Sequence, residues 1–260
     1  SPLRKTLKLV NPLGEDTSIM RTIILPSMLD ILARNFALKN KGVKLYELGK
    51  IYLPVEGQTL PDEPKRLIFG TYGEHEDFFS MKGEIVALLE QLNAKPATFV
   101  AEKQNPSYHP GRCANILIDG KVMGVLGQIH PLIAENYGIG ADVYVAELDF
   151  TALEGALESE RVFHSLPKFP TVTRDLALVC DESITVGALE YCIAEAGGKL
   201  LRKIDLFDIY RGPGIAPGKK SVAFSLELRA DDRTLTDEDS VNTVNRVLDA
   251  LREKLDVVLR

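Results

Sequence analysis

The alternation of apolar and polar positions is clearest between residues 169 and 260. Apolar side chains recur at every second position over 174–180 and over 221–229, and this period of two predicts a strand in each range. The positions expected to share one buried face are Leu176, Leu178 and Cys180 in the first strand and Val222, Phe224, Leu226 and Leu228 in the second.

A further strand is expected over 203–211, but two phases are open for it. Either Ile204 and Leu206 or Phe207 and Ile209 can face the same side as the other buried residues. A β-bulge, which inserts one extra residue into a strand, would allow both pairs to do so.

Helical spacing lies between these strands. Thr185 can cap a helix that carries Val186, Leu189 and Ile193, and the glycine pair at 197–198 ends it. Thr236 opens a second helix with acidic residues in its first turn, and the stripe expected to be buried is Val241, Val244, Leu248, Leu251 and Leu255. The last residues, DVVLR, are long enough for a closing strand. The order βαββαβ is typical of a ferredoxin-like sheet with both helices on one face.

The middle of the opposite face of that sheet is expected to be small and mildly polar. That face would carry Ser221, Ala223, Ser225, Glu227 and Arg229 on one strand and Asp175, Ala177 and Val179 on another. One interpretation is a solvated surface without a partner. The other is a surface that RNA approaches closely, without the stacked aromatic residues that RNA-binding sheets usually carry on such a strand.

Several sequence blocks in this region resemble a known family. They are KFP at 168–170, TRDLALV at 173–179, LFDIYRG at 206–212, GKKSVAF at 218–224 and RTLTDE at 233–238. In this order and spacing they are similar to the ferredoxin-fold anticodon-binding domain of the bacterial phenylalanyl-tRNA synthetase β subunit. The resemblance covers 167–260 and implies that this region binds the anticodon part of tRNA(Phe).

Residues 1–160 predict a different arrangement of strands and helices. Strands are expected before Pro26 and at 44–54, 67–72, 94–100, 114–127 and 142–150. Helices are expected to begin at Pro26 and at 78, the latter capped by Ser80, and a short one is expected over 130–139. Asp119-Gly120 between two apolar runs predicts a two-residue hairpin. The expected fold is α+β, an antiparallel sheet with helices, followed by the ferredoxin-like domain. The composition changes near 158–168, where we expect the domain boundary.

This first region also carries a resemblance. The blocks NPLGEDTSIMRTIILPSML at 11–29, KLYELGKIYLP at 44–54 and YHPGRCANILIDGKVMGVLGQIHP at 108–131 are similar to the class II-like core module of the same β subunit. The resemblance implies a non-catalytic core that pairs with an α subunit in an (αβ)₂ tetramer. It also implies a fragment of a longer protein, since the family's β subunit carries further modules. The stretches MRTIILPSML and VMGVLGQI can be that interface or plain core.

The catalytic signatures of class II synthetases are missing. Such enzymes use an arginine in an Arg-x-Glu motif to hold ATP phosphates, and this sequence contains no Arg-x-Glu. Glu47, Gly49 and Lys50 stand where the first signature is expected. We therefore expect no catalytic residue, no metal site and no cofactor in this chain. The resemblance implies ATP and Mg²⁺ for the whole enzyme.

Composition and charge narrow these expectations. The three cysteines show no paired spacing and no apolar run is long enough to span a membrane, which favours a cytoplasmic protein. The net charge is −6, and from Pro167 onward fourteen basic residues face sixteen acidic ones, so RNA must meet a local cluster rather than a basic domain. The residues expected to contact tRNA are Lys168, Arg174, Ala177, Arg211, Ser221, Ala223, Ser225 and Arg260.

Three alternatives remain open from the sequence. Arg174 can instead pair with a nearby acid such as Asp208. The βαββαβ region can be a small-molecule sensor that binds an amino acid, because fold alone does not determine function. A single-chain organellar synthetase carries the same anticodon domain, but the missing class II arginines argue against it.

Overall fold

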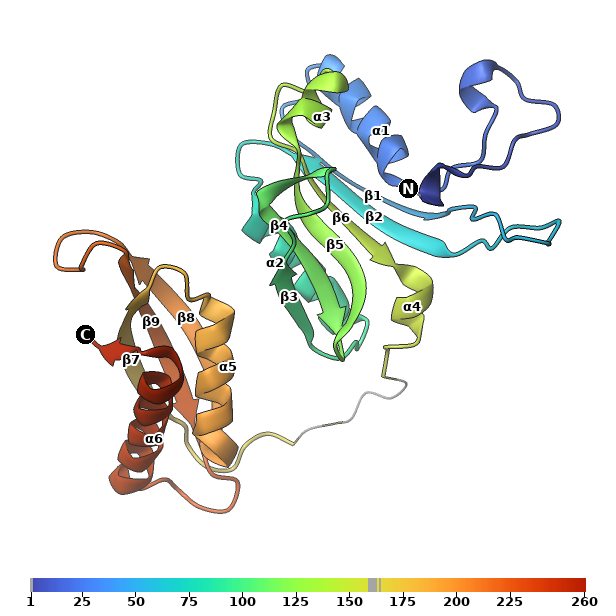
Figure 1. Cartoon of the computed structure of the whole chain (residues 1–260). Coiled ribbons are helices and arrows are strands. Elements are labelled where there is room, and N and C mark those ends of the chain that lie inside the picture. The colour runs from blue at the N-terminus through green and yellow to red at the C-terminus, as the bar shows by residue number, and fades with distance from the viewer. Residues whose placement is uncertain (1, 159–162, 164) are drawn as a thin grey trace. The chain divides into compact units, whose positions relative to one another are not determined.

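The chain divides into two compact units, Ser1–Val162 and Phe163–Arg260. The computed structural model describes residues 2–158, 163 and 165–260 (Figure 1). Each unit has its own sheet and its own core. In the described part of the chain, no helix is long and apolar enough to cross a membrane.

The first unit is built on a six-stranded antiparallel sheet in the order β1-β2-β6-β5-β4-β3. Its strands are β1 (Val43–Lys50), β2 (Lys65–Tyr72), β3 (Ala97–Ala101), β4 (Tyr108–Ile118), β5 (Lys121–Ile129) and β6 (Tyr144–Asp149). Its helices are α1 (Leu25–Ala37), α2 (Phe78–Gln91), α3 (Pro131–Asn136) and α4 (Phe150–Glu154), with short 3₁₀ turns at Pro2–Arg4 and Glu15–Thr17.

The central strands of this sheet are buried on both faces. Ile68 and Tyr72 of β2 pack with α1 in one core cluster, whereas Leu67 and Phe69 of the same strand pack with α2 in the other. Successive side chains of a strand point to opposite faces of the sheet. When the residues on both faces are apolar, each face needs a layer of other elements to cover it. The stretches MRTIILPSML and VMGVLGQI mostly belong to these cores, which supports the plain-core interpretation of them.

Two sequence expectations in this unit need correction. Between residue 2 and Pro26 the structure has no continuous strand, and the strand pairing there is an isolated antiparallel bridge between Lys8 and Ile19. The cap of α2 is Asp77 rather than Ser80, because the Asp77 carboxylate accepts from the backbone N–H of Ser80 and the Ser80 hydroxyl accepts in return from that of Asp77. The Asp119-Gly120 hairpin is confirmed, with both residues at positive φ.

The second unit is a four-stranded antiparallel sheet in the order β10-β7-β9-β8. Its elements are β7 (Val172–Asp181), α5 (Val186–Gly197), a 3₁₀ turn at Gly198–Leu200, β8 (Leu201–Tyr210), β9 (Lys219–Leu228), α6 (Asp237–Leu255) and β10 (Val258–Leu259). Both helices lie on the same face of the sheet (Figure 1). The predicted ferredoxin-like βαββαβ order is confirmed.

The helix caps predicted for this unit are confirmed, and the predicted buried stripe of the last helix contains one error. Thr185 and Thr236 cap α5 and α6, and Thr236 forms a capping box with Asp239. Val241 is 49% exposed, whereas Val247, outside the predicted stripe, is fully buried. The register shift between Leu206 and Asp208 is the bulge that the sequence left open, and it lets both Ile204 and Ile209 pack with the core.

Candidate nucleic-acid interface

The face of the second sheet that the helices leave uncovered is the candidate site. Directly opposed residues of antiparallel strands point to the same face, so the register defines rows across it. One row joins Tyr210 of β8, Ser221 of β9 and Val179 of β7. The next row joins Asp208, Ala223 and Ala177. The predicted small residues of this face, Ala177, Ser221, Ala223 and Ser225, therefore lie side by side.

Ala177, Ser221 and Ala223 have smaller side chains than their neighbours in these two rows, and this low strip is called the recess below. Ser221 is only 3% exposed and Ala223 only 8%, so surrounding atoms already shield both residues from solvent. The last residue, Arg260, is bonded to β7 through its backbone N–H, which donates to the carbonyl oxygen of Ala177 at 2.8 Å. The guanidinium carbon of Arg260 lies 5.3 Å from the centroid of the Tyr210 ring. Arg260 thus reaches from one edge of the sheet to β8, over side chains small enough to let it pass.

Tyr210 is the functional candidate that the sequence analysis missed. The bulge at 206–208 reverses the phase of the end of β8, so Tyr210 shares the face of Ser221 while Ile209 enters the core. The Tyr210 hydroxyl donates to the carbonyl oxygen of Pro213 at 3.2 Å. Counting Ile204 and Ile209 as both buried would have revealed the bulge and, with it, an aromatic ring on the open face.

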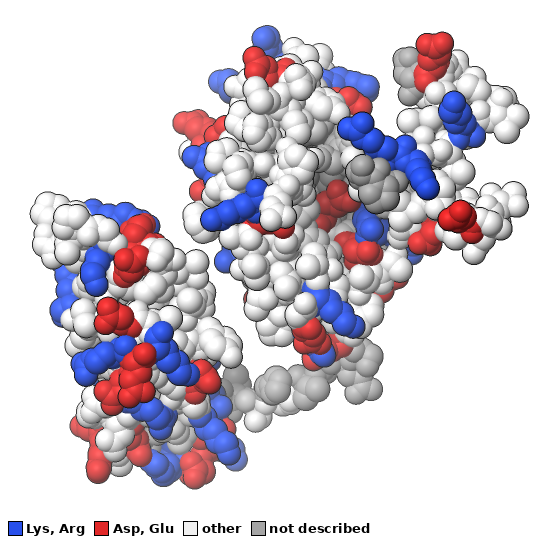
Figure 2. Space-filling model, in the orientation of Figure 1, with Lys and Arg blue, Asp and Glu red and all other residues white. Residues whose placement is uncertain are grey.

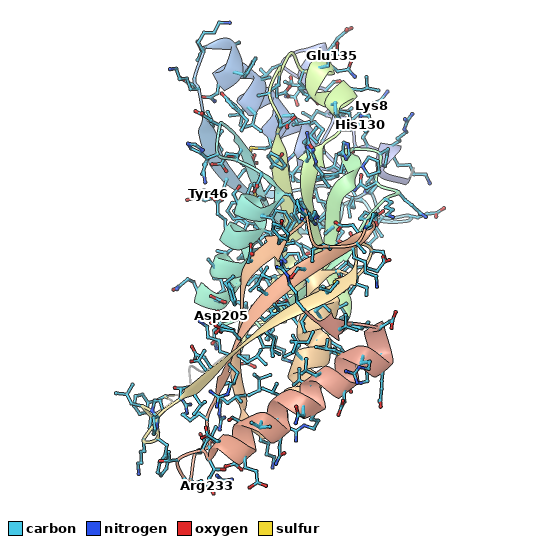
Figure 3. All side chains as sticks on the ribbon, turned by 90° about the vertical axis from the view of Figure 1, so that its left-hand side faces the viewer. Lys8, Tyr46, His130, Glu135, Asp205 and Arg233 are labelled. Atoms are coloured by element: carbon cyan, nitrogen blue, oxygen red, sulfur yellow. The ribbon has the colours of Figure 1, made fainter. Side chains whose placement is uncertain are left out.

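The other half of the open face is acidic. Asp205 and Asp175 lie on either side of Ser225 in one row, and Glu227 lies in the next. Lys203 is the basic residue of this half, and its ammonium group pairs with the Asp205 carboxylate at 2.7 Å (Asp205 is labelled in Figure 3). Like charges repel, so this half disfavours a phosphate backbone.

Figure 2 shows basic and acidic side chains interleaved over the visible side of this unit rather than gathered in a basic patch. Of the predicted basic contacts, Lys168 is exposed in the segment before β7. Arg174 pairs in register with Leu226, so it lies on the helix-covered face and not on the open one. Its guanidinium donates to Ser240 at 3.0 Å and to the Asp237 carboxylate at 3.3 Å, both in α6. The expected partner Asp208 is therefore wrong.

Arg211 lies at the carboxyl end of β8 and is also engaged. Its Nε and terminal nitrogen contact the same carboxylate oxygen of Glu182, at 2.9 and 2.8 Å. This contact lowers the pKa of the Glu182 carboxyl. Lys220, which is almost fully buried, donates from its ammonium group to the backbone carbonyl of Glu182 at 3.0 Å. Arg211 and Lys220 thus both hold the turn at Glu182.

In the first unit, the residues at the expected catalytic signature make local ion pairs. Glu47 pairs with Arg21 at 2.7 Å, and Lys50 pairs with Glu63 at 3.0 Å. A Cβ added at Gly49 would lie 2.2 Å from the Arg21 guanidinium, so the glycine lets Arg21 lie against β1. Over the described ranges, no three His, Cys, Asp or Glu side chains are grouped in a way that could hold a metal ion.

Comparisons with known proteins agree with the sequence resemblance. Residues 1–150 match the family described as the phenylalanyl tRNA synthetase beta chain CLM domain, and residues 167–260 match the ferredoxin-fold anticodon binding domain. The chain is 42% identical over 261 residues to the phenylalanine–tRNA ligase beta subunit of Clostridium acetobutylicum, with 100% of this chain and 33% of that protein covered.

Two further relatives carry the same name. The proteins of Clostridium tetani and Bacillus subtilis are each 40% identical, over 99% and 96% of this chain. The chain spans about a third of the length of these relatives, at 33% and 32%. The resemblance inferred from the sequence blocks is confirmed. The chain belongs to the phenylalanyl-tRNA synthetase beta chain family, and its residues 167–260 form a ferredoxin-fold anticodon binding domain.

Proposed function

We propose that this chain serves phenylalanyl-tRNA synthesis as part of a phenylalanine–tRNA ligase beta subunit, and that its open sheet face holds the anticodon region of tRNA(Phe). The observation that carries the proposal is the Tyr210 ring beside a recess floored by Ala177, Ser221 and Ala223 on an anticodon-binding fold. Single-stranded bases stack on aromatic rings and on guanidinium planes, and small floor residues let a splayed base approach the sheet.

Charge suggests how the RNA lies on this face. The recess carries Arg260 at one side, whereas the Asp175, Asp205 and Glu227 half repels phosphates. The RNA backbone is therefore proposed to pass near Arg260, with a base directed toward Tyr210. Asp208, exposed beside Ala223, is a suitable acceptor for N–H groups on a base edge.

The remaining expectations belong to the whole enzyme. The name of the relatives supports a partner subunit, and we propose the α subunit in an (αβ)₂ assembly in the cytoplasm, with ATP and Mg²⁺ used at the partner's active site. The chain itself is proposed to have no catalytic residue. The purified chain should therefore show no phenylalanine-dependent exchange of pyrophosphate into ATP, and robust exchange would contradict this.

The central experiment measures tRNA(Phe) binding to the full chain and to Tyr210→Ala at one fixed salt concentration. Loss of one stacked base is expected to weaken binding about tenfold. The matched control is Tyr191→Ala, which removes a tyrosine that is 73% exposed on α5, on the helix side of the same unit. Equal affinity of Tyr210→Ala and the unaltered chain would reject this site. A melting temperature raised by an amino acid, with no tRNA binding, would favour a sensor instead.

A further inference from the structure

The loop that follows Tyr210 packs against its ring. A Cβ added at Gly212 would lie 2.8 Å from the Tyr210 hydroxyl oxygen and 3.0 Å from the carbon that bears it. The next residue, Pro213, accepts the hydrogen bond from that hydroxyl. The loop therefore holds the outer end of the ring by direct contact at one residue and by a hydrogen bond at the next.

A second set of contacts holds the other end of the loop. The backbone N–H of Glu182 donates to the carbonyl oxygen of Gly218 at 2.9 Å. The Glu182 carboxylate binds Arg211, and the Glu182 carbonyl accepts from Lys220, so one residue links the end of β7 to both ends of the loop. Gly214 and Gly218, both at positive φ, permit the tight path between these anchors.

We propose that Gly212 and the Arg211–Glu182 ion pair are positioning residues that fix the Tyr210 ring over the recess. The inference rests on the proposed function, because it assigns the loop a role in that RNA site. It also gives Arg211 a task other than phosphate binding, since its Nε and one terminal nitrogen are already engaged by Glu182.

Gly212→Ala separates this role from a general effect on folding. Gly212 is not one of the glycines at positive φ, so its backbone tolerates alanine. The atoms that the added Cβ meets belong to the outer end of the Tyr210 side chain rather than to the backbone. The ring is expected to move while the fold is kept. The control is Gly187→Ala in α5, where an added Cβ meets nothing within 4 Å.

The position of the ring has its own readout. With ring-labelled tyrosine, the Tyr210 resonance is assigned by its loss in Tyr210→Phe, and its chemical shift reports the nearby Arg260 and Pro213. We expect this resonance to move in Gly212→Ala and to stay in place in Gly187→Ala. An unmoved resonance in Gly212→Ala overturns the inference whatever tRNA does.

A double-mutant cycle then tests whether Gly212 acts through Tyr210. Gly212→Ala is expected to weaken tRNA(Phe) binding about tenfold in the unaltered chain and to have no effect in the Tyr210→Ala background. Equal losses in both backgrounds would overturn the inference. If Tyr210→Ala binds normally, the base-stacking proposal itself fails, and if Tyr210→Ala binds weakly while Gly212→Ala binds normally, only the positioning role fails.

Charge reversal tests the Arg211–Glu182 pair. Arg211→Glu alone should weaken tRNA binding and shift the Tyr210 resonance, and combination with Glu182→Arg should restore both. Rescue is expected because the exchanged pair can still link β7 to the loop. A direct phosphate contact by Arg211 predicts no rescue of binding, and that result would assign Arg211 to the RNA instead.

Discussion

The two sheets of this chain differ in how many of their faces are buried. In β2 of the first unit, Ile68 faces one core and Leu67 faces the other, so both faces of this strand are apolar and covered. In β9 of the second unit, Val222, Phe224 and Leu226 face the helices, while the alternate positions are Ser221, Ala223 and Ser225. Both sheets are antiparallel, and only the second leaves a whole face for a ligand.

This difference in burial shows which residues can serve ligand binding without being needed for the stability of the fold. Truncation of the apolar residues at the centre of the first sheet disturbs one of two cores, whereas the exposed positions on the open face of the second sheet can change with little loss of packing. The open face is also where polar rows, an aromatic ring and the Arg260 side chain meet. The comparison therefore predicts that neighbouring residues of one strand have opposite consequences.

The largest expected effect is on the stability of the second unit. Phe224 is fully buried, and Phe224→Ala should cost about 3–5 kcal/mol of unfolding free energy, because it removes the largest side chain of this core. Ser225→Ala, one residue further along the strand, should change it by less than about 0.5 kcal/mol. Denaturant unfolding of the chain checks both. Similar losses at the two positions would mean that the face of Ser225 is covered in solution.

A structural feature of this chain was predictable from the sequence where local stereochemistry determines it, and was not where tertiary packing determines it. The alternation over 174–180 and 221–229, the caps Thr185 and Thr236, and the Asp119-Gly120 hairpin depend on local stereochemistry, and all were predicted correctly. Tyr210 was missed because its direction depends on a bulge that the packing of Ile204 and Ile209 selects. A long-range choice of this kind leaves no unique pattern in one strand.

The site residues divide in the same way. Ala177, Ser221, Ala223 and Ser225 were placed on the open face by counting, and the register agrees. The partners of Arg174 and Arg211 could not be predicted, because Asp237, Ser240 and Glu182 lie far from them in sequence and are brought near only by the fold. Counting gives the face of a residue, while its ion-pair partner requires the tertiary structure.

The next effect contrasts two small residues, Gly124 in β5 and Ala177 in β7. An added Cβ at Gly124 would lie 2.3 Å from the Glu147 carbonyl oxygen, so Gly124→Ala should cost about 1–3 kcal/mol of stability. Ala177→Val should change stability by less than about 0.5 kcal/mol and should weaken tRNA binding, because the larger side chain narrows the recess. Thermal unfolding and tRNA titration of both variants test this. Unchanged tRNA affinity in Ala177→Val would argue against close approach of RNA.

One carboxyl group in each unit should contribute to the pH dependence of stability, and the two contributions have opposite signs. Arg233 and the cap Thr236 lower the pKa of Asp239 at the start of α6 (Arg233 is labelled in Figure 3), so the unfolded state binds this proton more readily. That stability is present above the ordinary carboxyl pKa of about 4 and is lost as pH falls below it. In the first unit, burial raises the pKa of Glu147, so its contribution is largest below about pH 4 and declines as pH rises through the folded pKa.

Two amide variants measure these slopes. Asp239→Asn should flatten the acid-side loss of stability of the second unit, and Glu147→Gln should flatten the decline of the first unit as pH rises. The measurement is the denaturant midpoint of unfolding of each unit at a series of pH values. Amide resonances that belong to one unit monitor the unfolding of that unit. An unaltered pH profile in either variant would assign the slope to other carboxyl groups.

The smallest expected effect separates the two faces of the second sheet. Arg174 lies on the helix side of β7 and binds Ser240 and the exposed Asp237, so Arg174→Ala should cost at most about 1 kcal/mol of stability. Because its side chain does not share the open face, tRNA affinity should stay unchanged, whereas Arg260→Ala should lower affinity without changing stability. Both variants remove one positive charge, so a long-range electrostatic effect would weaken binding equally in the two. A loss of affinity confined to Arg174→Ala would place the RNA on the helix side and would reverse the functional contrast between the two faces.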